Sequence, residues 1–471
     1  MTDYNKLTEG PIIKSLLTLA VPIILANILQ TAYQLTDTFW VGRLGAEAVA
    51  AISLSFPIIF LLVSLGGGLA MAGAILVAQY KGKNDQRMTN HVSTQTMLMM
   101  FFVSIFLSVF GYFLAPMIMR LMGAEGTVFT DAVSYLRVLF MGLFFLFSFF
   151  IYQSLMRGIG NVKVPFYLVL STVTLNLFLD PLFILGFGII PPMGVTGAAI
   201  ATIFTQGLAG AIGLGMLFSG KYGIQIKIKE LKPDYKLIKK IFNLGFPASV
   251  EQSGRALGMT FMAFLVASFG TVSIAAFGIG IRILSFVIIP ALGFAVATST
   301  LVGQNIGANK MERAEKVVKV SLVLGFVALT LAGLIFFLLA KPIAAFFIPG
   351  DLAVVQVTTL FIKLQAFTFG FIGIQMVLNG AFRGAGNTVI SMVLSLISLW
   401  LLRVPLAYFL SYYTSLAEKG LWWAFPIANV VGAMLTVAWF AKGTWKKKRL
   451  TEEIKIVEKT VEESMIEEGV I

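Results

Sequence analysis

The chain contains no cysteine and a single histidine, and it carries few charged residues. Without cysteine it can form no disulfide, thiolate nucleophile or cysteine-based metal site. Only 12% of its 471 residues are Asp, Glu, Lys or Arg, whereas an average soluble domain has about 25%. This is too little charge to cover a soluble particle. The composition therefore excludes an ordinary soluble enzyme, a disordered protein and a secreted disulfide scaffold.

Hydrophobic residues make up 58% of the chain and occur in long continuous runs. A transmembrane β-barrel would instead show alternating hydrophobicity. A bilayer-spanning helix needs about 20 mostly apolar residues. We therefore expect an all-α polytopic membrane protein with about twelve transmembrane helices, near residues 15–38, 48–78, 93–119, 128–156, 162–187, 194–219, 241–267, 273–303, 315–345, 353–379, 388–411 and 419–441. Prolines inside four of these segments predict kinks: Pro22, Pro57, Pro247 and Pro290.

The net charge of +13 is concentrated in alternate loops. Basic residues gather in 81–87, 157–163, 221–240, 310–319, at Arg383 and in 442–449, and few lie in the loops between them. Because cytoplasmic loops of membrane proteins accumulate Lys and Arg, this pattern predicts that both termini are cytoplasmic and that the chain lies in the inner (cytoplasmic) cell membrane. The basic surplus is then explained without a nucleic-acid partner.

The chain also repeats itself at an offset of about 225 residues. LTLAVPIILANILQ (17–30) aligns with FNLGFPASVEQSGR (242–255), VAQYKGKND (77–85) with VGQNIGANK (302–310), and LMRGIGNVKVP (155–165) with AFRGAGNTVIS (381–391). The repeat predicts two six-helix lobes related by a pseudo-two-fold axis along the membrane normal. The N-lobe is expected at 1–219 and the C-lobe at 241–441, with a cytoplasmic linker between them at 220–240 and a charged cytoplasmic tail at 442–471. Two lobes that rock against each other provide alternating access, which indicates a transporter.

Three carboxylates fall well inside the predicted spans: Asp37, Asp180 and Glu251. Charges at membrane depth are costly and usually functional. Asp37 ends a polar stripe on one face of the first helix, formed by Asn27, Gln30, Tyr33, Gln34 and Asp37. On the fifth span Thr172, Asn176 and Asp180 share a face at steps of four, and Thr202 on the sixth span is a further candidate ligand.

Two carboxylates in one low-dielectric lobe form a natural site for a proton or Na⁺. Carboxylate, amide and hydroxyl oxygens suit a hard cation, so we expect a coupling site at Asp37, Asp180, Asn176 and Thr202, with candidate Na⁺ ligands in the first three. The alternative is that Asp37 and Asp180 only hydrogen-bond neighbouring helices. For Asn176, Gln34 and Tyr33, packing and a direct role are equally compatible with the sequence.

The second lobe differs because its carboxylate has a basic neighbour. Arg255 lies four residues after Glu251, so the two can pair along one helix face. A structural pair and a coupling role both remain open. We expect a substrate cavity or second site among Tyr33, Gln34, Gln30, Gln153, Glu251, Gln252 and Arg255. No Walker motif is present, so we expect no direct ATP drive and no cofactor beyond the coupling ion, H⁺ or Na⁺.

The segment LTEGPIIKSLLTLAVPIILANILQTAYQLTDTFWVGRLGAEAVAA (7–51) resembles the opening of MATE proteins, the multidrug and toxic compound extrusion family. LNLFLDP (175–181) and the RGxGN turns are similar to that family too, most of all to its DNA-damage-inducible-protein-F-like branch. The resemblance covers about residues 7–441. It implies twelve helices in two lobes, and a cation site at Asp37 and Asp180 with Asn176, Thr202 and Tyr33 near them. It also places Gln153 where some members carry Asn.

The sequence departs from other branches, which place a Glu further along the seventh helix and an Asp on the tenth. Here Ala256 and its neighbours are not acidic and the tenth span has no carboxylate, which counts against a second cation site.

Three functions follow as hypotheses. The first is an H⁺- or Na⁺-coupled antiporter that exports cationic or amphipathic compounds, acting as a monomer and not as an enzyme. The second is a flippase for lipid-linked oligosaccharides or a related lipid carrier, whose pyrophosphate would favour a cavity rich in basic residues such as Arg255, Arg282 and Arg403. The third is a membrane scaffold, against which the intramembrane carboxylates argue.

Overall fold

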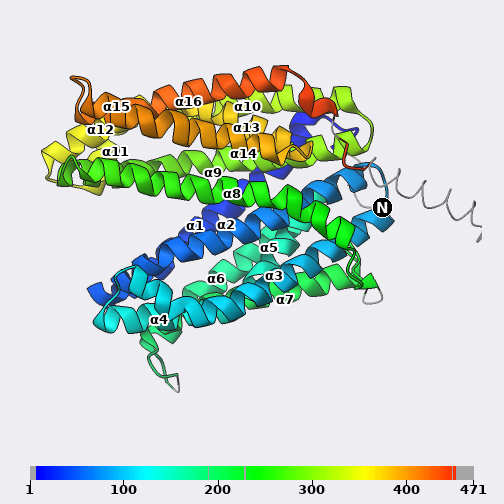
Figure 1. Cartoon of the computed structure of the whole chain (residues 1–471), viewed down its shortest axis with the longest axis horizontal. Coiled ribbons are helices and arrows are strands. Elements are labelled where there is room, and N and C mark those ends of the chain that lie inside the picture. The colour runs from blue at the N-terminus through cyan, green and yellow to red at the C-terminus, as the bar shows by residue number, and fades with distance from the viewer. Residues whose placement is uncertain (1–6, 189, 228–229, 448, 452–471) are drawn as a thin grey trace, which may run out of the picture. The chain divides into compact units, whose positions relative to one another are not determined.

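The computed structural model describes residues 7–188, 190–227, 230–447 and 449–451, so most of the predicted tail lies outside the described residues. In this part the regular secondary structure is helical, with turns and loops between the helices and one isolated bridge between Phe187 and Ile190 (Figure 1). The α-helices are α1 (Ile12–Gly42), α2 (Ala46–Gly82), α3 (Gln86–Leu121), α4 (Gly126–Met141), α5 (Leu143–Gly158), α6 (Lys163–Leu185), α7 (Gly194–Ser219), α8 (Tyr235–Ala267), α9 (Thr271–Gly307), α10 (Met311–Leu338), α11 (Ala340–Phe347), α12 (Leu352–Ala366), α13 (Phe369–Gly384), α14 (Thr388–Leu396), α15 (Val404–Tyr412) and α16 (Glu418–Ala441). A π-helical segment, η3 (Ile397–Arg403), joins α14 to α15, and a short 3-10 helix, η4 (Thr444–Lys447), follows α16.

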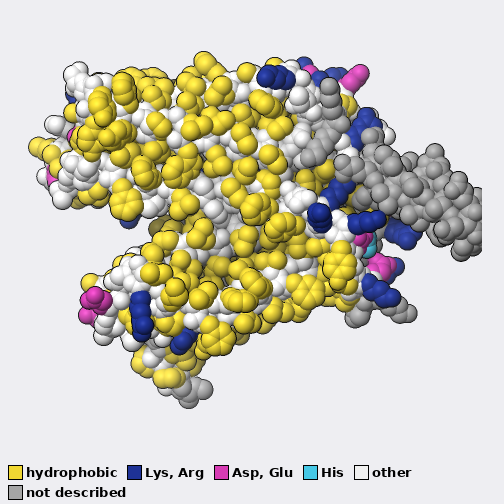
Figure 2. All heavy atoms as spheres, in the orientation of Figure 1, with side chains coloured by type: hydrophobic (Ala, Val, Ile, Leu, Met, Phe, Trp, Pro, Cys, Tyr) yellow, Lys and Arg dark blue, Asp and Glu magenta, His cyan; other side chains and the backbone are white. Residues whose placement is uncertain are grey.

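Nine helical segments in the described part are long and apolar enough to cross a membrane, and two bent helix pairs raise this to eleven. The remaining expected span is α8, whose middle carries Glu251 and Arg255. On the face shown in Figure 2, hydrophobic side chains cover the length of the helices, while Lys and Arg lie near helix ends. This distribution agrees with the predicted polytopic helical class.

Two expected spans are broken where no proline marks them. The 128–156 segment forms α4 and α5, which meet at Gly142 with a bend of 52°. The 353–379 segment forms α12 and α13, which meet at Phe367 and Thr368 with a bend of 51°. By contrast, α1, α2, α8 and α9 each continue through an internal proline.

The helices form two compact units. Unit 2 comprises residues 22–77 and 85–249, and within it α7 packs against α4, α5 and α6. Unit 1 comprises, of the described residues, 7–21, 78–84 and everything from Val250 onward; within it α9 and α10 both pack against α13. Three helices, α1, α2 and α8, therefore contribute to both units. The lobe and linker boundaries drawn from the sequence remain a prediction.

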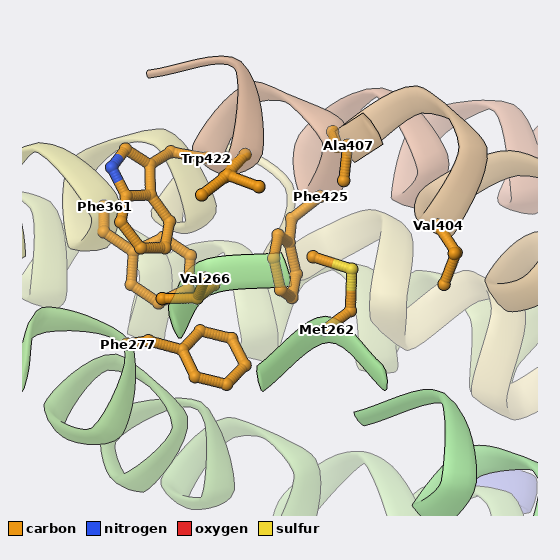
Figure 3. Close-up of a cluster of buried hydrophobic side chains, with 10 residues drawn as sticks. Met262, Val266, Phe277, Phe361, Val404, Ala407, Trp422 and Phe425 are labelled. Atoms are coloured by element: carbon orange, nitrogen blue, oxygen red, sulfur yellow. The ribbon is translucent and has the colours of Figure 1, made fainter. Parts of the chain in front are cut away.

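The interior of unit 1 is built around a cluster of aromatic side chains (Figure 3). The Phe361 ring lies 4.8 Å from Trp422 and 5.4 Å from Phe425, centroid to centroid. Phe361 and both of those partners are fully buried, and Phe277 packs against them from α9. Since each ring buries about 150–250 Å² of apolar surface, this cluster fixes α9, α12 and α16 relative to one another.

The segment between α7 and α8 has a helix-capping residue at each end. Gly220 ends α7 in the left-handed conformation (φ 71°), which glycine adopts without steric cost. Asp234 precedes α8, and its Oδ1 accepts a hydrogen bond from the Leu237 amide at 3.0 Å, as a helix N-cap does. Its Oδ2 lies 3.2 Å from Nε2 of His91 on α3. The predicted linker is thus held against unit 2.

Candidate functional site

The acidic pair predicted from the sequence lies within unit 2. Asp180 on α6 is fully buried, and Asp37 on α1 is half-buried with its Oδ1 covered. The two carboxylates are close enough for their charges to interact. A pair of carboxyl groups held together away from water favours sharing a proton or a cation between them.

Several polar atoms around this pair have no hydrogen-bond partner among the described residues. They are Oδ1 of Asp37, both carboxylate oxygens of Asp180, and both amide atoms of Asn176. Asn176 sits one helical turn before Asp180, and 1% of its surface is exposed. Buried polar atoms are almost always paired, because an unsatisfied one costs about 1–3 kcal/mol. Such a group of acceptor oxygens is suited to binding a proton or a hard cation.

Tyr33 and Thr202 join α1 to α7 beside the carboxylates. The Tyr33 hydroxyl donates a hydrogen bond to Oγ1 of Thr202 at 2.8 Å. Tyr33 is buried and lies within electrostatic range of both Asp37 and Asp180. Thr172, by contrast, uses its hydroxyl on its own helix, donating to the carbonyls of Leu168 and Val169. Thr202 and Tyr33 are therefore placed near the acidic pair, whereas the Thr172 hydroxyl is already engaged.

The other polar residues predicted for this lobe are less enclosed. Gln30 is half-buried and Gln34 is exposed. The polar stripe on α1 therefore does not face wholly inward. Gln153 on α5 accepts a hydrogen bond from the Arg157 guanidinium.

The part of the chain that the structure describes holds no group of three or more His, Asp or Glu residues that suits a metal ion. A cation at Asp37 and Asp180 would need neutral oxygens as its further ligands.

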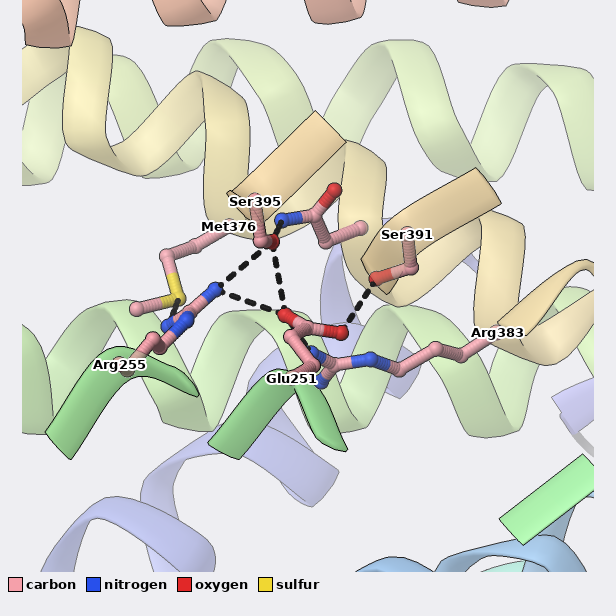
Figure 4. A network of polar contacts seen from close by, with 7 residues as sticks. Glu251, Arg255, Met376, Arg383, Ser391 and Ser395 are labelled. Carbon is pink, nitrogen blue, oxygen red and sulfur yellow. Dashed lines mark hydrogen bonds and ion pairs between the residues drawn. The ribbon is translucent and has the colours of Figure 1, made fainter. Parts of the chain in front are cut away.

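A second polar network surrounds Glu251 in unit 1 (Figure 4). The Glu251 carboxylate is fully buried and pairs with Arg255 at 2.8 Å and with Arg383 at 2.6 Å. It also accepts hydrogen bonds from Ser391 at 3.0 Å and from Ser395 at 2.8 Å. Glu251 thus ties α8 to α13 and α14. The predicted Glu251–Arg255 pair is present, although it is only part of this larger network.

The basic side of unit 1 extends beyond this network. Arg403, the last residue of η3, donates to Oδ1 of Asn429 at 2.8 Å and lies 4.8 Å from the ring centroid of Phe425. Arg282 is exposed on α9, and Gln252 is half-buried beside Glu251.

Sequence reasoning missed four residues of these two networks. Tyr135 on α4 is buried within electrostatic range of Asp37 and Asp180. Nothing local distinguished it, because it lies near the start of its span among other polar residues, Asp131, Ser134 and Arg137. Arg383, Ser391 and Ser395 reach Glu251 from more than 130 residues away. Arg383 looked like a loop residue, and nothing local distinguishes the two serines.

The helical bundle, its intramembrane carboxylates and the repeat between its halves are typical of a polytopic membrane transporter. The chain belongs to the MATE family, since the MatE family model matches residues 22–182 and again 247–409. The two matches begin at the prolines that the internal repeat aligns, Pro22 and Pro247. The resemblance seen in the sequence is thereby confirmed.

Similar proteins cover almost the whole chain. A Bacillus subtilis protein named probable multidrug resistance protein YoeA is 30% identical, with 96% of this chain and 98% of that protein aligned. A Shewanella oneidensis protein named FAD transporter is 27% identical, over 92% of this chain and 95% of that one. A crystal structure of a MATE protein in complex with MaL6 superimposes with a TM-score of 0.89 at 25% identity, covering 95% of this chain and 100% of that chain. The predicted fold class, a helical multi-pass membrane protein, is confirmed.

Proposed function

We propose that the protein is a secondary active efflux antiporter, exporting cationic or amphipathic compounds in exchange for H⁺ or Na⁺. The observation that carries this proposal is the pair Asp37 and Asp180, of whose four carboxylate oxygens three are buried without a partner among the described residues. A carboxylate is an expensive residue for merely joining helices in a membrane, because a neutral amide makes the same bonds without a charge. The names of the multidrug resistance relatives support drug-like cargo.

In this mechanism Asp37 and Asp180 are negative when they hold a cationic compound. A proton or Na⁺ that enters from outside neutralises them and weakens their attraction for the compound, which then leaves. Asn176 and Thr202 supply neutral oxygens for the incoming ion, and Tyr33 orients Thr202. Each monovalent ion that crosses down 100 mV provides about 2.3 kcal/mol, enough to drive a modest concentration ratio.

Replacement of one carboxylate tests the proposal. Asp37→Asn keeps the side-chain shape and removes the charge, so we expect it to abolish drug resistance in an efflux-deficient strain at unchanged expression. Asp131→Asn provides a matched control, because it removes a carboxylate from α4 of the same unit outside the acidic pair. Full resistance with Asp37→Asn would contradict the proposal.

The proposed setting is the inner membrane with both termini cytoplasmic, where the protein acts as a monomer on small molecules and binds neither nucleic acid nor a resident cofactor. The basic residues near helix ends support this orientation. The relative named FAD transporter indicates that cargo of this chain need not be confined to drugs.

A flippase for lipid-linked oligosaccharides is the second candidate, favoured by the basic groups of unit 1 around Arg255 and Arg403. Proteoliposomes that contain a fluorescent polyprenyl-pyrophosphate disaccharide separate the two functions. Protein-dependent movement of this lipid between leaflets, with no exchange of soluble drug for an ion, would favour the flippase.

A further inference from the structure

Unit 1 contains more positive charge around Glu251 than this carboxylate balances. Glu251 is paired with two guanidinium groups, those of Arg255 and Arg383. Arg403 has no carboxylate within ion-pair distance in the described part of the chain. It lies one helical turn after Trp400, whose indole Nε1 donates at 3.0 Å to the carbonyl of Gly254, the residue before Arg255. One negative charge thus faces three positive charges. Because uncompensated charge there is costly, the arrangement indicates a further anionic partner.

The carboxylate itself cannot supply more compensation. Both oxygens of Glu251 are engaged, with Oε1 bonded to Arg255, Arg383 and Ser395 and Oε2 bonded to Ser391. Arg383 alone, which is buried beside it at 2.6 Å, would neutralise Glu251. The Arg255 charge is therefore surplus to the structural pairing.

Arg255 is the member of the network that remains reachable. Its side chain is 32% exposed, whereas that of Glu251 is 0% exposed and that of Arg383 is 9% exposed. Its Nη2 atom donates to Glu251 and Ser395, while Nη1 contacts only the Met376 sulfur at 3.7 Å. A guanidinium carries five donors, and a thioether is a weak acceptor. Arg255 therefore keeps strong donor capacity on its exposed edge.

Arg403 also keeps unused hydrogen-bond donor capacity. Its Nη2 donates to the neutral amide oxygen of Asn429, and its buried Nε has no partner among the described residues. Asn429 is held in turn, because its amide donates to Oγ1 of Thr368 at 3.1 Å. Arg403 also ends the π-helical segment η3, and π-helical turns are frequent at functional sites.

We propose that Arg255 and Arg403 form an oxyanion-binding site in unit 1 that receives a carboxylate or phosphate group of the transported compound. Guanidinium groups bind such oxyanions through paired, charge-assisted hydrogen bonds. The site rests on the proposed transport function and narrows its substrate class to amphipathic compounds that carry an anionic group, zwitterions included.

A matched pair of dyes tests this site by binding alone. The probes are a rhodamine carrying a free carboxylate and its methyl ester, which share the same cationic ring system. Their affinities for the purified full-length protein in phosphatidylcholine nanodiscs are measured by fluorescence anisotropy, for the wild type and for Arg255→Gln. Lys341→Gln, which removes one exposed positive charge from α11, is the control. Arg255→Gln leaves the Glu251–Arg383 pair in place.

We expect the wild type to bind the acid more tightly than the ester. Arg255→Gln should lower the affinity for the acid about tenfold and change that for the ester far less, while Lys341→Gln leaves the preference for the acid intact. Equal or weaker binding of the acid by the wild type, or no binding of it, would overturn the site. An equal loss for both dyes in Arg255→Gln would show that Arg255 is structural only.

Lipid headgroups carry the same chemistry, so the binding is repeated with phosphatidylglycerol added to the nanodiscs. If the preference for the acid disappears only there, the site exists and an anionic lipid competes for it. If the preference persists, the anionic group of the soluble compound is the ligand. Neither measurement needs ion coupling, so a failure of Asp37→Asn to abolish transport would overturn the antiport proposal without affecting this site.

Discussion

The Glu251 network predicts an order of stability among three variants. Glu251→Gln keeps the shape of the side chain but removes its charge, which leaves Arg255 and Arg383 without a counterion. Breaking a buried ion pair in this way costs about 3–5 kcal/mol, because an uncompensated charge remains. Arg383→Gln should cost less, roughly 1.5–3 kcal/mol, since Glu251 keeps Arg255. Arg255→Gln should cost least, about 1 kcal/mol or below, because Arg255 is partly exposed and Arg383 remains.

The free energy of unfolding is measured by SDS titration in mixed micelles, followed by circular dichroism. Glu125→Gln, at an exposed position before α4, controls for the loss of a carboxylate. Combining Glu251→Gln with Arg383→Gln removes one of the two stranded cations and should recover part of the loss, so the two effects would not add. A loss for Glu251→Gln that is no larger than that for Arg255→Gln would refute the reasoning.

Two further predictions concern packing and helix capping. A Cβ on Gly280 would overlap the Phe361 ring in the aromatic core of unit 1. Gly280→Ala should therefore destabilise the protein by about 1–3 kcal/mol, measured as a lower melting temperature. An unchanged melting temperature would mean that the ring moves aside freely. Burial raises the pKa of Asp234, but the Leu237 amide and the His91 ring outweigh it and hold this pKa below its usual value. The stabilisation is then present above about pH 4 and is lost as the pH falls through the lowered pKa. Asp234→Ala should lower the free energy of unfolding by about 1 kcal/mol and flatten its dependence on acid pH, whereas Asp234→Asn should retain the cap. Equal losses of stability in the two variants would show that capping is not the cause.

Hydropathy and repeats predicted most of the fold because they are properties of single segments. Each expected span corresponds to one helix or to a run of consecutive helical segments, three of them (α14, η3 and α15) at 388–411. The family matches begin at Pro22 and Pro247, where the internal repeat places them. The breaks at Gly142 and Thr368 were missed. A long apolar run looks the same whether its helix is straight or bent, and neither break has a proline.

The sequence predicted site residues only where a charged side chain stands inside an apolar span. Asp37 and Asp180 stood out because lipid cannot satisfy a carboxylate, and the structure places both in unit 2. The partners of Glu251 did not stand out. Arg383 lies at a helix end, where arginine is ordinary, and serines are common in membrane helices. Only tertiary packing brings Arg383, Ser391 and Ser395 to one carboxylate.

Ion-driven transport in proteoliposomes tests most directly whether the acidic pair couples transport to an ion. A fluorescent cationic compound is loaded, and a Na⁺ gradient and a pH gradient are imposed separately on wild-type and Asp37→Asn protein. We predict that at least one gradient drives efflux by the wild type and that neither drives it in the variant. Efflux by Asp37→Asn that responds to a gradient as strongly as the wild type would contradict the account.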